Sequence, residues 1–228
     1  MSDAFFSACS YCDLFAESAG LCSDDNTTSV APIFLVTFGA GSATFSLDTP
    51  ANFSFTTSYH QLFANPISDG DFAFTNVVPS SPVVWHGGAV DHTPNDSGGY
   101  MFLANADPNP GEFYKDTVDN LCIGQRYEFS VYLTNIVRPY GLAKPNVLFE
   151  IRTATSDNTL IAQKSSGDIP EYSSMTWTKY GISFVATNTS VVLLMISNTP
   201  NGGGNDMALD DIAFSICSNA SSGVCSIG

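Results

Sequence analysis

Short runs of β-type residues, interrupted by turn residues, dominate the chain from Ala31 onward. Apolar and polar positions alternate over residues 127–133, so four apolar side chains share one face of a strand: Tyr127, Phe129, Val131 and Leu133. The run at 191–196 is apolar at every position, which indicates a central strand covered on both faces. Strands of this length and spacing are typical of an all-β sandwich of two antiparallel sheets.

The predicted strands are bounded by Gly, Pro, Asn or Asp, and four prolines (Pro139, Pro145, Pro170 and Pro200) fall between them, where a missing N–H does no harm. They are Ile33–Phe38, Thr44–Leu47, Asn52–Tyr59, Phe72–Val78, Tyr100–Asn105, Glu112–Thr117, Arg126–Ile136, Val147–Ala154, Thr159–Lys164, Thr176–Val185, Val191–Ser197 and Met207–Ile216.

The pattern divides the chain into a cysteine-bearing N-terminal extension (1–30), a sandwich (31–217) and a C-terminal tail (218–228). Within the extension, only residues 13–19 have the pattern of a helical turn or two. The first residues lack the basic region of a signal peptide, so either a signal was removed or delivery takes another route. No apolar run approaches the roughly 20 residues of a membrane span.

The balance of charge is strongly acidic. The chain carries 22 Asp and Glu against 7 Lys and Arg, a formal net charge of −15, while 44% of its residues are hydrophobic, enough to bury a core. A polyanion repels phosphate backbones and anionic lipid, so we expect no nucleic-acid binding and no membrane insertion. Cationic partners, Ca²⁺ above all, fit this charge better.

The cysteines are Cys9, Cys12, Cys22, Cys122, Cys217 and Cys225. An even number in a chain poor in lysine favours disulfides and a secreted or cell-surface location. Cys9 and Cys12 are alternatively half of a zinc site, which needs a second pair of ligands. Because Cys122 precedes a predicted strand and Cys217 closes the last one, we expect these two to bridge and the other four to pair among themselves.

Five N-x-S/T motifs permit glycosylation in a secretory pathway, at Asn26, Asn52, Asn95, Asn188 and Asn219.

A series of short segments, taken in order, points to a known family. The segments are Phe38–Ser42, Asp69–Phe72, Trp85–His86, Asp91–Thr93, Gly99–Ala106, Gly111–Tyr114, Leu121–Cys122, Tyr127–Phe129, Pro145–Ile151, Gly167–Pro170, Trp177–Phe184 and Asn205–Ile212, before Cys217. In this order they resemble the carbohydrate-binding-module-like, galactose-binding-like jelly-roll domains of surface adhesins and gliding-associated proteins of Bacteroidetes. The resemblance covers residues 33–217 and implies a jelly roll in an extracellular setting. Related modules often carry a cysteine where this chain has Gly202–Gly204.

The acidic segment 205–211 is the leading candidate for a cation site. In a regular strand, Asp210 would share a face with Ile212 and Phe214, so its carboxylate would lie on the core side. Such a carboxylate must be neutralised, hydrogen-bonded or metal-bound. The resemblance implies a structural Ca²⁺ near it, with Asp211 and Asp206 as further candidate ligands. The alternative is that Asp210 caps loop amides and Asp211 is solvated.

The loop at 91–96 is rich in oxygen ligands. Asp91 and Asp96 could complete the Ca²⁺ site, or the loop could be an ordinary network of Asx turns. His86 and His92 lie in loops without a metal-binding motif, so they give only weak evidence of a metal site.

Catalytic signatures are absent from the sequence. It contains no Gly-x-Ser-x-Gly motif and no cysteine with an evident histidine partner, and nothing marks a carboxylate as a catalytic acid. We therefore expect no enzymatic activity.

Aromatic residues near predicted loops are candidates for sugar binding, because a flat ring stacks on the apolar face of a pyranose. The candidates are Trp85, Tyr114, Tyr140 and Tyr172, each of which could instead be a packing residue. Trp177 lies within a predicted strand and is expected in the core.

Two functions remain open. The first is a non-catalytic extracellular module that contributes to adhesion, or to a surface filament or coat, through self-association or contacts with other surface proteins. The second is a calcium-dependent carbohydrate-binding module that recognises a polysaccharide. The apolar segment 31–38 is relevant to the first function, since it is either the first strand of the domain or a strand that adds to the sheet edge of a neighbour.

Overall fold

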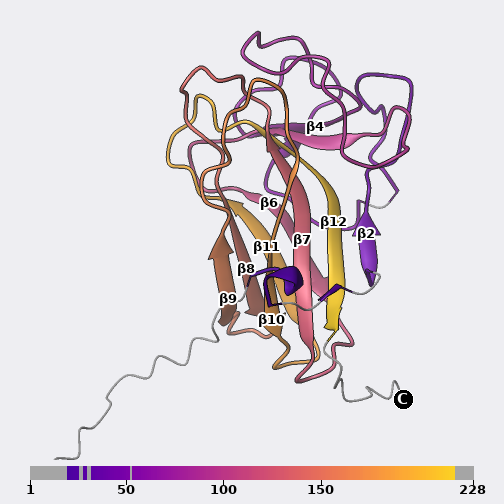
Figure 1. The fold of residues 1–228 in the computed structure, drawn as a ribbon, viewed down its shortest axis with the longest axis vertical. Coiled ribbons are helices and arrows are strands. Elements are labelled where there is room, and N and C mark those ends of the chain that lie inside the picture. Colours follow the sequence, from indigo (N-terminus) through magenta and orange to yellow (C-terminus); the bar gives the residue numbers. More distant parts are fainter. Residues whose placement is uncertain (1–19, 26–27, 30–31, 52, 219–228) are drawn as a thin grey trace, which may run out of the picture.

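The computed structural model describes residues 20–25, 28–29, 32–51 and 53–218, which form a β-sandwich of two sheets packed face to face (Figure 1). The predicted jelly-roll sandwich is therefore confirmed. Among the described residues, no helix has the length and apolar character needed to cross a membrane.

The larger sheet has eight strands, in the order β10-β7-β12-β5-β4-β3, with β1 and β2 also paired to β12. Their bounds are β1 (Thr28–Ser29), β2 (Phe34–Val36), β3 (His60–Gln61), β4 (Asp71–Thr75), β5 (Met101–Asn105), β7 (Arg126–Asn135), β10 (Thr178–Val185) and β12 (Met207–Ser218). The smaller sheet has the order β6-β11-β8-β9, with β6 (Glu112–Val118), β8 (Val147–Thr153), β9 (Leu160–Ser165) and β11 (Val191–Ser197). Neighbouring strands are antiparallel, apart from the short parallel pair β3 and β4.

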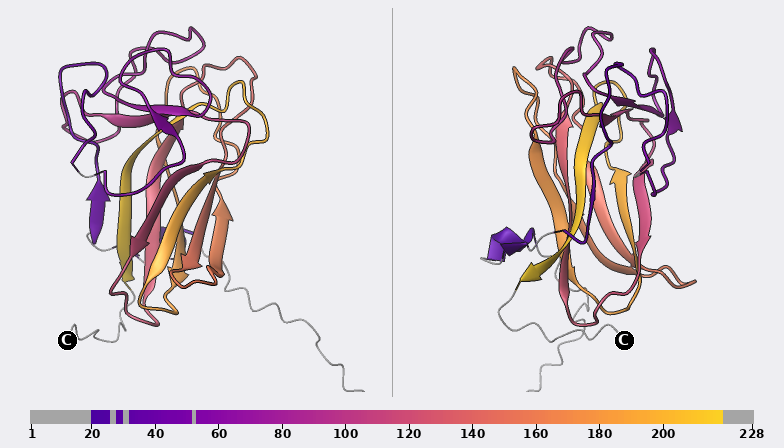
Figure 2. Two further views of the ribbon diagram at one scale, coloured as in Figure 1. Left: turned by 180° about the vertical axis from the view of Figure 1, so that it is seen from behind. Right: turned by 90° about the vertical axis from the view of Figure 1, so that its right-hand side faces the viewer.

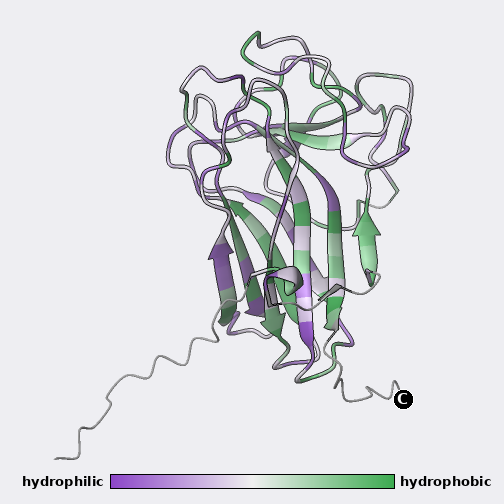
Figure 3. Cartoon of the chain, viewed as in Figure 1, coloured by the Kyte–Doolittle hydropathy of each residue, from purple (hydrophilic) through white to green (hydrophobic). Residues whose placement is uncertain are grey.

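The main core lies between the two sheets. As the alternation predicts, Tyr127, Phe129, Val131 and Leu133 on β7 are buried there. Aromatic rings fill one part of this core, where Phe72 on β4 stacks on Phe102 on β5 with 4.3 Å between ring centroids. In Figure 3, hydrophobic positions are interspersed with more polar ones along the strands of both sheets.

A second, smaller core covers part of the outer face of the larger sheet. Met101 and Leu103 on β5 point outward and pack against Trp85, Ile136 and Val137 from connecting segments. Long connecting segments gather at one end of the sandwich (Figure 2). Burial of this apolar area fixes the loops on the strands.

Strand β11 is central in its sheet, between β6 and β8, as the apolar run predicts. Its outer face is only partly covered, because Leu194 is buried while Val192 and Ile196 are half-buried. The prediction that both faces of β11 are buried is therefore correct for Leu194 but not for the other two outward side chains.

Two predicted strands do not form. Residues 44–47 and the described part of 52–59 make only isolated bridges, at Phe45 with Thr75 and at Thr56 with Lys115. Both segments run along the edge of existing strands, and their aromatic side chains pack into the core without a continuous ladder of backbone hydrogen bonds.

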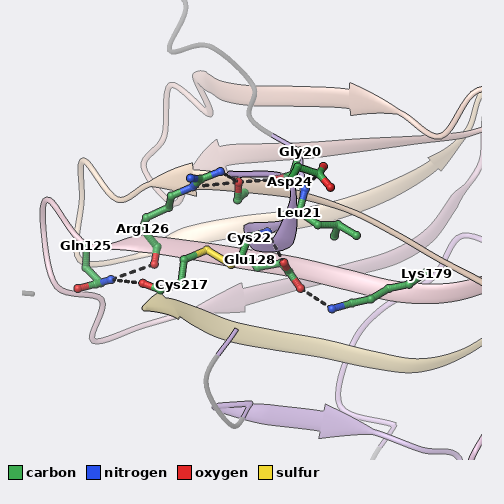
Figure 4. Close-up of a disulfide and its surroundings, with 10 residues drawn as sticks. Gly20, Leu21, Cys22, Asp24, Gln125, Arg126, Glu128, Lys179 and Cys217 are labelled. Atoms are coloured by element: carbon green, nitrogen blue, oxygen red, sulfur yellow. Dashed lines mark hydrogen bonds and ion pairs between the residues drawn. A yellow bond between two sulfur atoms is a disulfide. The ribbon is translucent and has the colours of Figure 1, made fainter. Parts of the chain in front are cut away.

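A disulfide joins Cys22 to Cys217, and the predicted bridge between Cys122 and Cys217 is therefore wrong. Cys22 begins the short 3-10 helix η1 (Cys22–Asp25), which lies against the outer face of the larger sheet at the end of β12 (Figure 4). Cys122 is also disulfide-bonded, and its backbone N–H donates to the Tyr127 hydroxyl. Cys9, Cys12 and Cys225 lie outside the described residues, as does the predicted helical segment 13–19.

Hydrogen bonds and an ion pair surround the disulfide. The Cys22 N–H donates to Glu128 Oε2 (2.6 Å), and the other oxygen of that carboxylate pairs with Lys179 Nζ (2.6 Å; Figure 4). The two cysteines are 195 residues apart, for which the chain-entropy model gives a stabilisation of about 5 kcal/mol. The disulfide thus fixes η1 on the sheet.

Candidate functional site

Most of the candidate residues lie on or near one end of the sandwich, here called the loop end, where β7 and β9 end and β6, β8, β10 and β12 begin (Figure 1). Three groups of residues are considered there: the acidic residues beside β12, the exposed aromatic residues, and the aromatic residues that the fold buries.

A β-bulge sets the direction of the Asp210 side chain. The pairing of β12 with β7 shifts between Asp210 and Ala213, and Asp211 has a φ of +50°. Because of this extra residue, Leu209 and Ile212 both face the core, and Asp210 points to the outer face. The prediction that Asp210 faces the core was wrong for this reason, although its side chain is fully buried.

The loop that follows Val90 covers Asp210. Asp210 Oδ2 accepts hydrogen bonds from the N–H groups of His92 (3.0 Å) and Thr93 (3.2 Å), and Oδ1 accepts one from the N–H of Asp211 (2.8 Å). Asp211 in turn contacts the His92 ring through Nδ1 (2.7 Å) and accepts from the Thr93 hydroxyl (2.9 Å). These contacts match the hydrogen-bonded alternative for Asp210 and hold the loop on the bulge.

Two further carboxylates converge next to this loop. A Cβ atom at Gly99 would overlap Asp91 Oδ2 and would lie 2.9 Å from Asp96 Cγ, so any other residue there would displace the Asp91 carboxylate from its present position. Asp91 Oδ2 is buried and has no hydrogen-bond partner among the described residues. Burial, followed by the charges of Asp96 and Asp211, raises the pKa of Asp91.

Asp206 lies apart from this group. Its Oδ2 accepts a hydrogen bond from the Trp85 indole N–H (2.7 Å), and burial raises its pKa to about 6. Burial and the charge of Asp211 likewise raise the pKa of Asp210, to about 7. Within the described part of the chain, no three His, Cys, Asp or Glu side chains are grouped as metal ligands.

Two of the four predicted sugar-binding aromatics are exposed, and their loops are joined. Tyr140 is 58% exposed and Tyr172 is 46% exposed. Glu171, the neighbour of Tyr172, accepts hydrogen bonds from the N–H groups of Gly141 and Leu142 (3.0 Å each). The two tyrosines and Leu142, also exposed, are called the Tyr140–Tyr172 surface below. No sequence pattern marked Glu171 for this role.

The other two predicted aromatics are buried, which corrects their assignment to a binding surface. Trp85 belongs to the second core and is held by Asp206. Tyr114 is fully buried between the sheets because it follows Phe113 at a bulged position of β6, and both rings turn inward. Trp177 is half-buried and packs against the second core, next to the strand in which it was predicted.

Two of the N-x-S/T asparagines can be placed. Asn95 is exposed in the loop beside Asp96, with a φ of +62°, and Asn188 is half-buried in the turn before β11. Asn26, Asn52 and Asn219 lie outside the described residues.

No protein-family model and no curated protein matches the chain. Solved structures do match, at low identity. One is the enzymatically active domain of tailspike protein 4 of bacteriophage CBA120 (TM-score 0.44, 10% identity, 78% of this chain and 21% of that chain). Another is the CBM22-1 xylan-binding domain of Paenibacillus barcinonensis Xyn10C (0.41, 10%, 82% and 96%). A third is the K1 cleaved adhesin domain of Lys-gingipain from Porphyromonas gingivalis W83 (0.39, 10%, 84% and 99%).

This chain spans about a fifth of the length of that solved tailspike chain.

The buried carboxylates predict how stability depends on pH. The folded-state pKa values of Asp206 and Asp210 lie above the ordinary value of 3.8, so the folded protein holds protons that the unfolded chain releases. The stabilisation of the folded state that comes from these protonated carboxyl groups is fully present below about pH 4. It is lost as the pH rises through about 6 to 7. At Asp206, the rise of the pKa from 3.8 to about 6 corresponds to about 3 kcal/mol of unfolding free energy. The melting temperature should therefore fall by several degrees from pH 5 to pH 8.

Asp206→Asn keeps an oxygen to accept from Trp85 and removes the titration, so its melting temperature should fall less over the same range. Asp48→Asn, at an exposed carboxylate elsewhere, should keep the wild-type slope. An unchanged slope in Asp206→Asn would contradict the role given to Asp206.

Proposed function

We propose that this protein is a non-catalytic extracellular binding module that holds a polysaccharide on its Tyr140–Tyr172 surface. The observation that carries the proposal is the pair of exposed tyrosine rings on two loops tied together by Glu171. Exposed aromatic side chains provide large contact area at low entropic cost, and their faces suit the apolar face of a sugar ring.

The link through Glu171 supports a preorganised surface. Its carboxylate accepts from two successive backbone N–H groups, an arrangement that fixes the loop conformation around Gly141, whose φ is +72°. Because both oxygens are engaged, Glu171 is a positioning residue rather than an acid or base. A loop held in its binding conformation loses less entropy when a ligand binds.

The net charge favours neutral glycans. A chain with a formal charge of −15 repels uronic-acid and sulfated polymers, most strongly at low salt. The disulfide between Cys22 and Cys217 supports an oxidising, extracellular setting.

The proposal predicts retardation in affinity gels that contain neutral polysaccharides, with xylan, mannan and a mixed-linkage β-glucan as probes and polygalacturonate as the acidic counterpart. Wild-type protein should be retarded by at least one neutral polymer and not by polygalacturonate at low salt. Tyr140→Ala and Tyr172→Ala should each weaken binding about 5-fold or more, since loss of one aromatic contact is worth roughly 1 kcal/mol or more.

The matched control is Phe63→Ala, which removes an exposed ring outside the Tyr140–Tyr172 surface. It should bind as wild type does. If the two tyrosine variants bind as well as the control, this surface is not the polysaccharide site.

We also propose that Ca²⁺ stabilises the module through Asp91 and Asp96. Their carboxylates converge at Gly99, and the buried Asp91 Oδ2, which has no hydrogen-bond partner among the described residues, fits a hard cation that prefers oxygen ligands. Asp210 and Asp211 already accept hydrogen bonds, so they position the loop, and Asp206 lies with Trp85.

For this cation site, Ca²⁺ should raise the melting temperature and EDTA should reverse the rise, because a ligand of the folded state at 100 times its Kd adds about 2.7 kcal/mol. Asp91→Asn and Asp96→Asn should lose the response, and Asp48→Asn should keep it. Equal melting curves of the wild-type protein in Ca²⁺ and in EDTA would exclude the site.

A second candidate function, assembly into an adhesive filament or coat, is favoured by one observation at strand β2. This strand pairs with β12 on one side, and no described strand pairs with its other edge. Ile33 and Leu35 there are each about half exposed (53% and 49%), and β2 is hydrophobic along its length in Figure 3. A strand edge that pairs with no described strand and carries apolar side chains can pair with the same edge of a second copy.

For this candidate, sedimentation velocity should detect a dimer that strengthens with salt, which screens the repulsion between two acidic copies. Leu35→Lys should restore the monomer, whereas Leu47→Lys, at another exposed leucine, should not. A protein that stays monomeric at high concentration and high salt would exclude assembly through β2.

A further inference from the structure

A small cavity of about 220 Å³ opens at the loop end, on a different set of loops from the Tyr140–Tyr172 surface. It lies where the segments before β3, before β4 and before β6 meet. Its lining includes Tyr59, Gly70, Asp107, Asn109 and Gly111. It is called the Tyr59 cavity below.

The Tyr59 hydroxyl is a buried donor that makes no hydrogen bond of normal geometry with a described residue. Tyr59 is only 6% exposed, and its ring stacks on Phe113 (4.9 Å between centroids). The Ser197 side chain and the Asp107 backbone nevertheless lie near enough to the hydroxyl to act against the rise of its pKa. Burial raises its pKa to about 12, so the hydroxyl keeps its proton. A buried polar group without a partner costs about 1–3 kcal/mol, and a ligand that accepts from it recovers that energy.

An acceptor in the same cavity is held ready by its neighbour. Asp107 Oδ1 accepts from the N–H (2.7 Å) and the side-chain amide (2.8 Å) of Asn109, which fixes the carboxylate. Oδ2 of that carboxylate makes no hydrogen bond with a described residue, and it lies 3.6 Å from where a Cβ at Gly70 would stand. Asn205, which is 1% exposed, donates to the Asp107 carbonyl (3.5 Å), and its own Oδ1 is a second buried atom that makes no hydrogen bond within the described part of the chain.

Glycine keeps the cavity open at two positions. A Cβ at Gly111 would lie 2.7 Å from the Tyr59 ring, and Gly70 has a φ of +87°, which disfavours any other residue. The space is therefore a consequence of residue choice in both loops.

The pair formed by Tyr59 and Asp107 selects one chemical class of ligand. An ammonium group can donate to the carboxylate but cannot accept from the tyrosine hydroxyl. An anion can accept from the hydroxyl but is repelled by Asp107. A hydroxyl group both donates and accepts, so two neighbouring hydroxyls of one ligand satisfy both residues.

We infer that the Tyr59 cavity binds one residue of a neutral sugar, or a polyol of similar size, through a vicinal diol that accepts from Tyr59 and donates to Asp107. The volume is below the range of roughly 300–1,000 Å³ typical of drug-sized ligands, so it suits a single ring. The inference does not depend on the Tyr140–Tyr172 surface, and the two sites are tested by different variants.

The test is titration of the ¹⁵N-labelled full chain with methyl mannoside, methyl galactoside, methyl glucoside and glycerol, followed by amide shifts. Glucuronate and glucosamine serve as charged probes. At least one neutral probe should shift the amides of Gly70, Asn109 and Gly111 with millimolar affinity, at least 5-fold tighter than either charged probe. Tyr59→Phe and Asp107→Asn should each weaken that binding 5-fold or more.

Two controls separate this inference from a structural role and from the proposed function. Tyr114→Phe removes a hydroxyl from another buried tyrosine, which contacts Asp116, and should leave binding unchanged. Tyr140→Ala should also leave it unchanged. Because the Tyr59 hydroxyl makes no hydrogen bond of normal geometry with a described residue, Tyr59→Phe should melt at the wild-type temperature or higher.

Three results would overturn the inference: no shifts at the cavity with any neutral probe, equal affinity for a charged probe, or wild-type affinity in Tyr59→Phe. The last result with a lowered melting temperature would assign the hydroxyl a purely structural role.

Discussion

Strand β12 has partners on both edges, and the arrangement of the molecule depends on those contacts. Strand β7 pairs with it from Met207 to Ile216, while β5, β2 and β1 share its other edge in turn. The disulfide to Cys22 lies near its C-terminal end, and the bulge at Asp210 and Asp211 interrupts its middle. One strand therefore joins the core, the η1 segment and the loop that carries Asp91 and Asp96.

The bulge changes the chemistry of the outer face because it moves a carboxylate under a loop. Backbone N–H groups of His92 and Thr93 would otherwise need water, and Asp210 supplies an acceptor inside the protein. The same burial that makes these bonds strong penalises the charged form, which explains why the pKa of Asp210 rises to about 7. Asp206 likewise supplies a buried acceptor, in this case for the indole N–H of Trp85. Both carboxylates join connecting segments to β12.

The sequence predicted the elements whose signal is local and periodic. Alternation placed Tyr127, Phe129, Val131 and Leu133 on the core face, and most strands were found within a few residues. The sequence pattern did not predict contacts between distant segments. The Cys22–Cys217 disulfide depends on where η1 meets the sheet, and the direction of the Asp210 side chain depends on a β-bulge. Aromatic type alone did not separate buried Trp85 and Tyr114 from exposed Tyr140 and Tyr172, because burial is decided by packing.

The two proposed sugar contacts use opposite physical strategies at the same end of the sandwich. The Tyr140–Tyr172 surface offers exposed apolar area with a fixed backbone, which favours an extended chain that slides across it and gains little from any single hydroxyl. The Tyr59 cavity offers a buried donor and a held acceptor, which recognise the orientation of neighbouring hydroxyls. Between them runs the segment at 200–206, where Gly204 lies against Leu142 on one side and Gly202 against Pro108 on the other. A glycan bound at both sites would cross this glycine-rich segment. Because Gly202, Gly203 and Gly204 have no side chains, they do not obstruct a ligand there. The Tyr140–Tyr172 surface would then provide affinity for a class of polymer, and the Tyr59 cavity would discriminate among the sugars of that polymer.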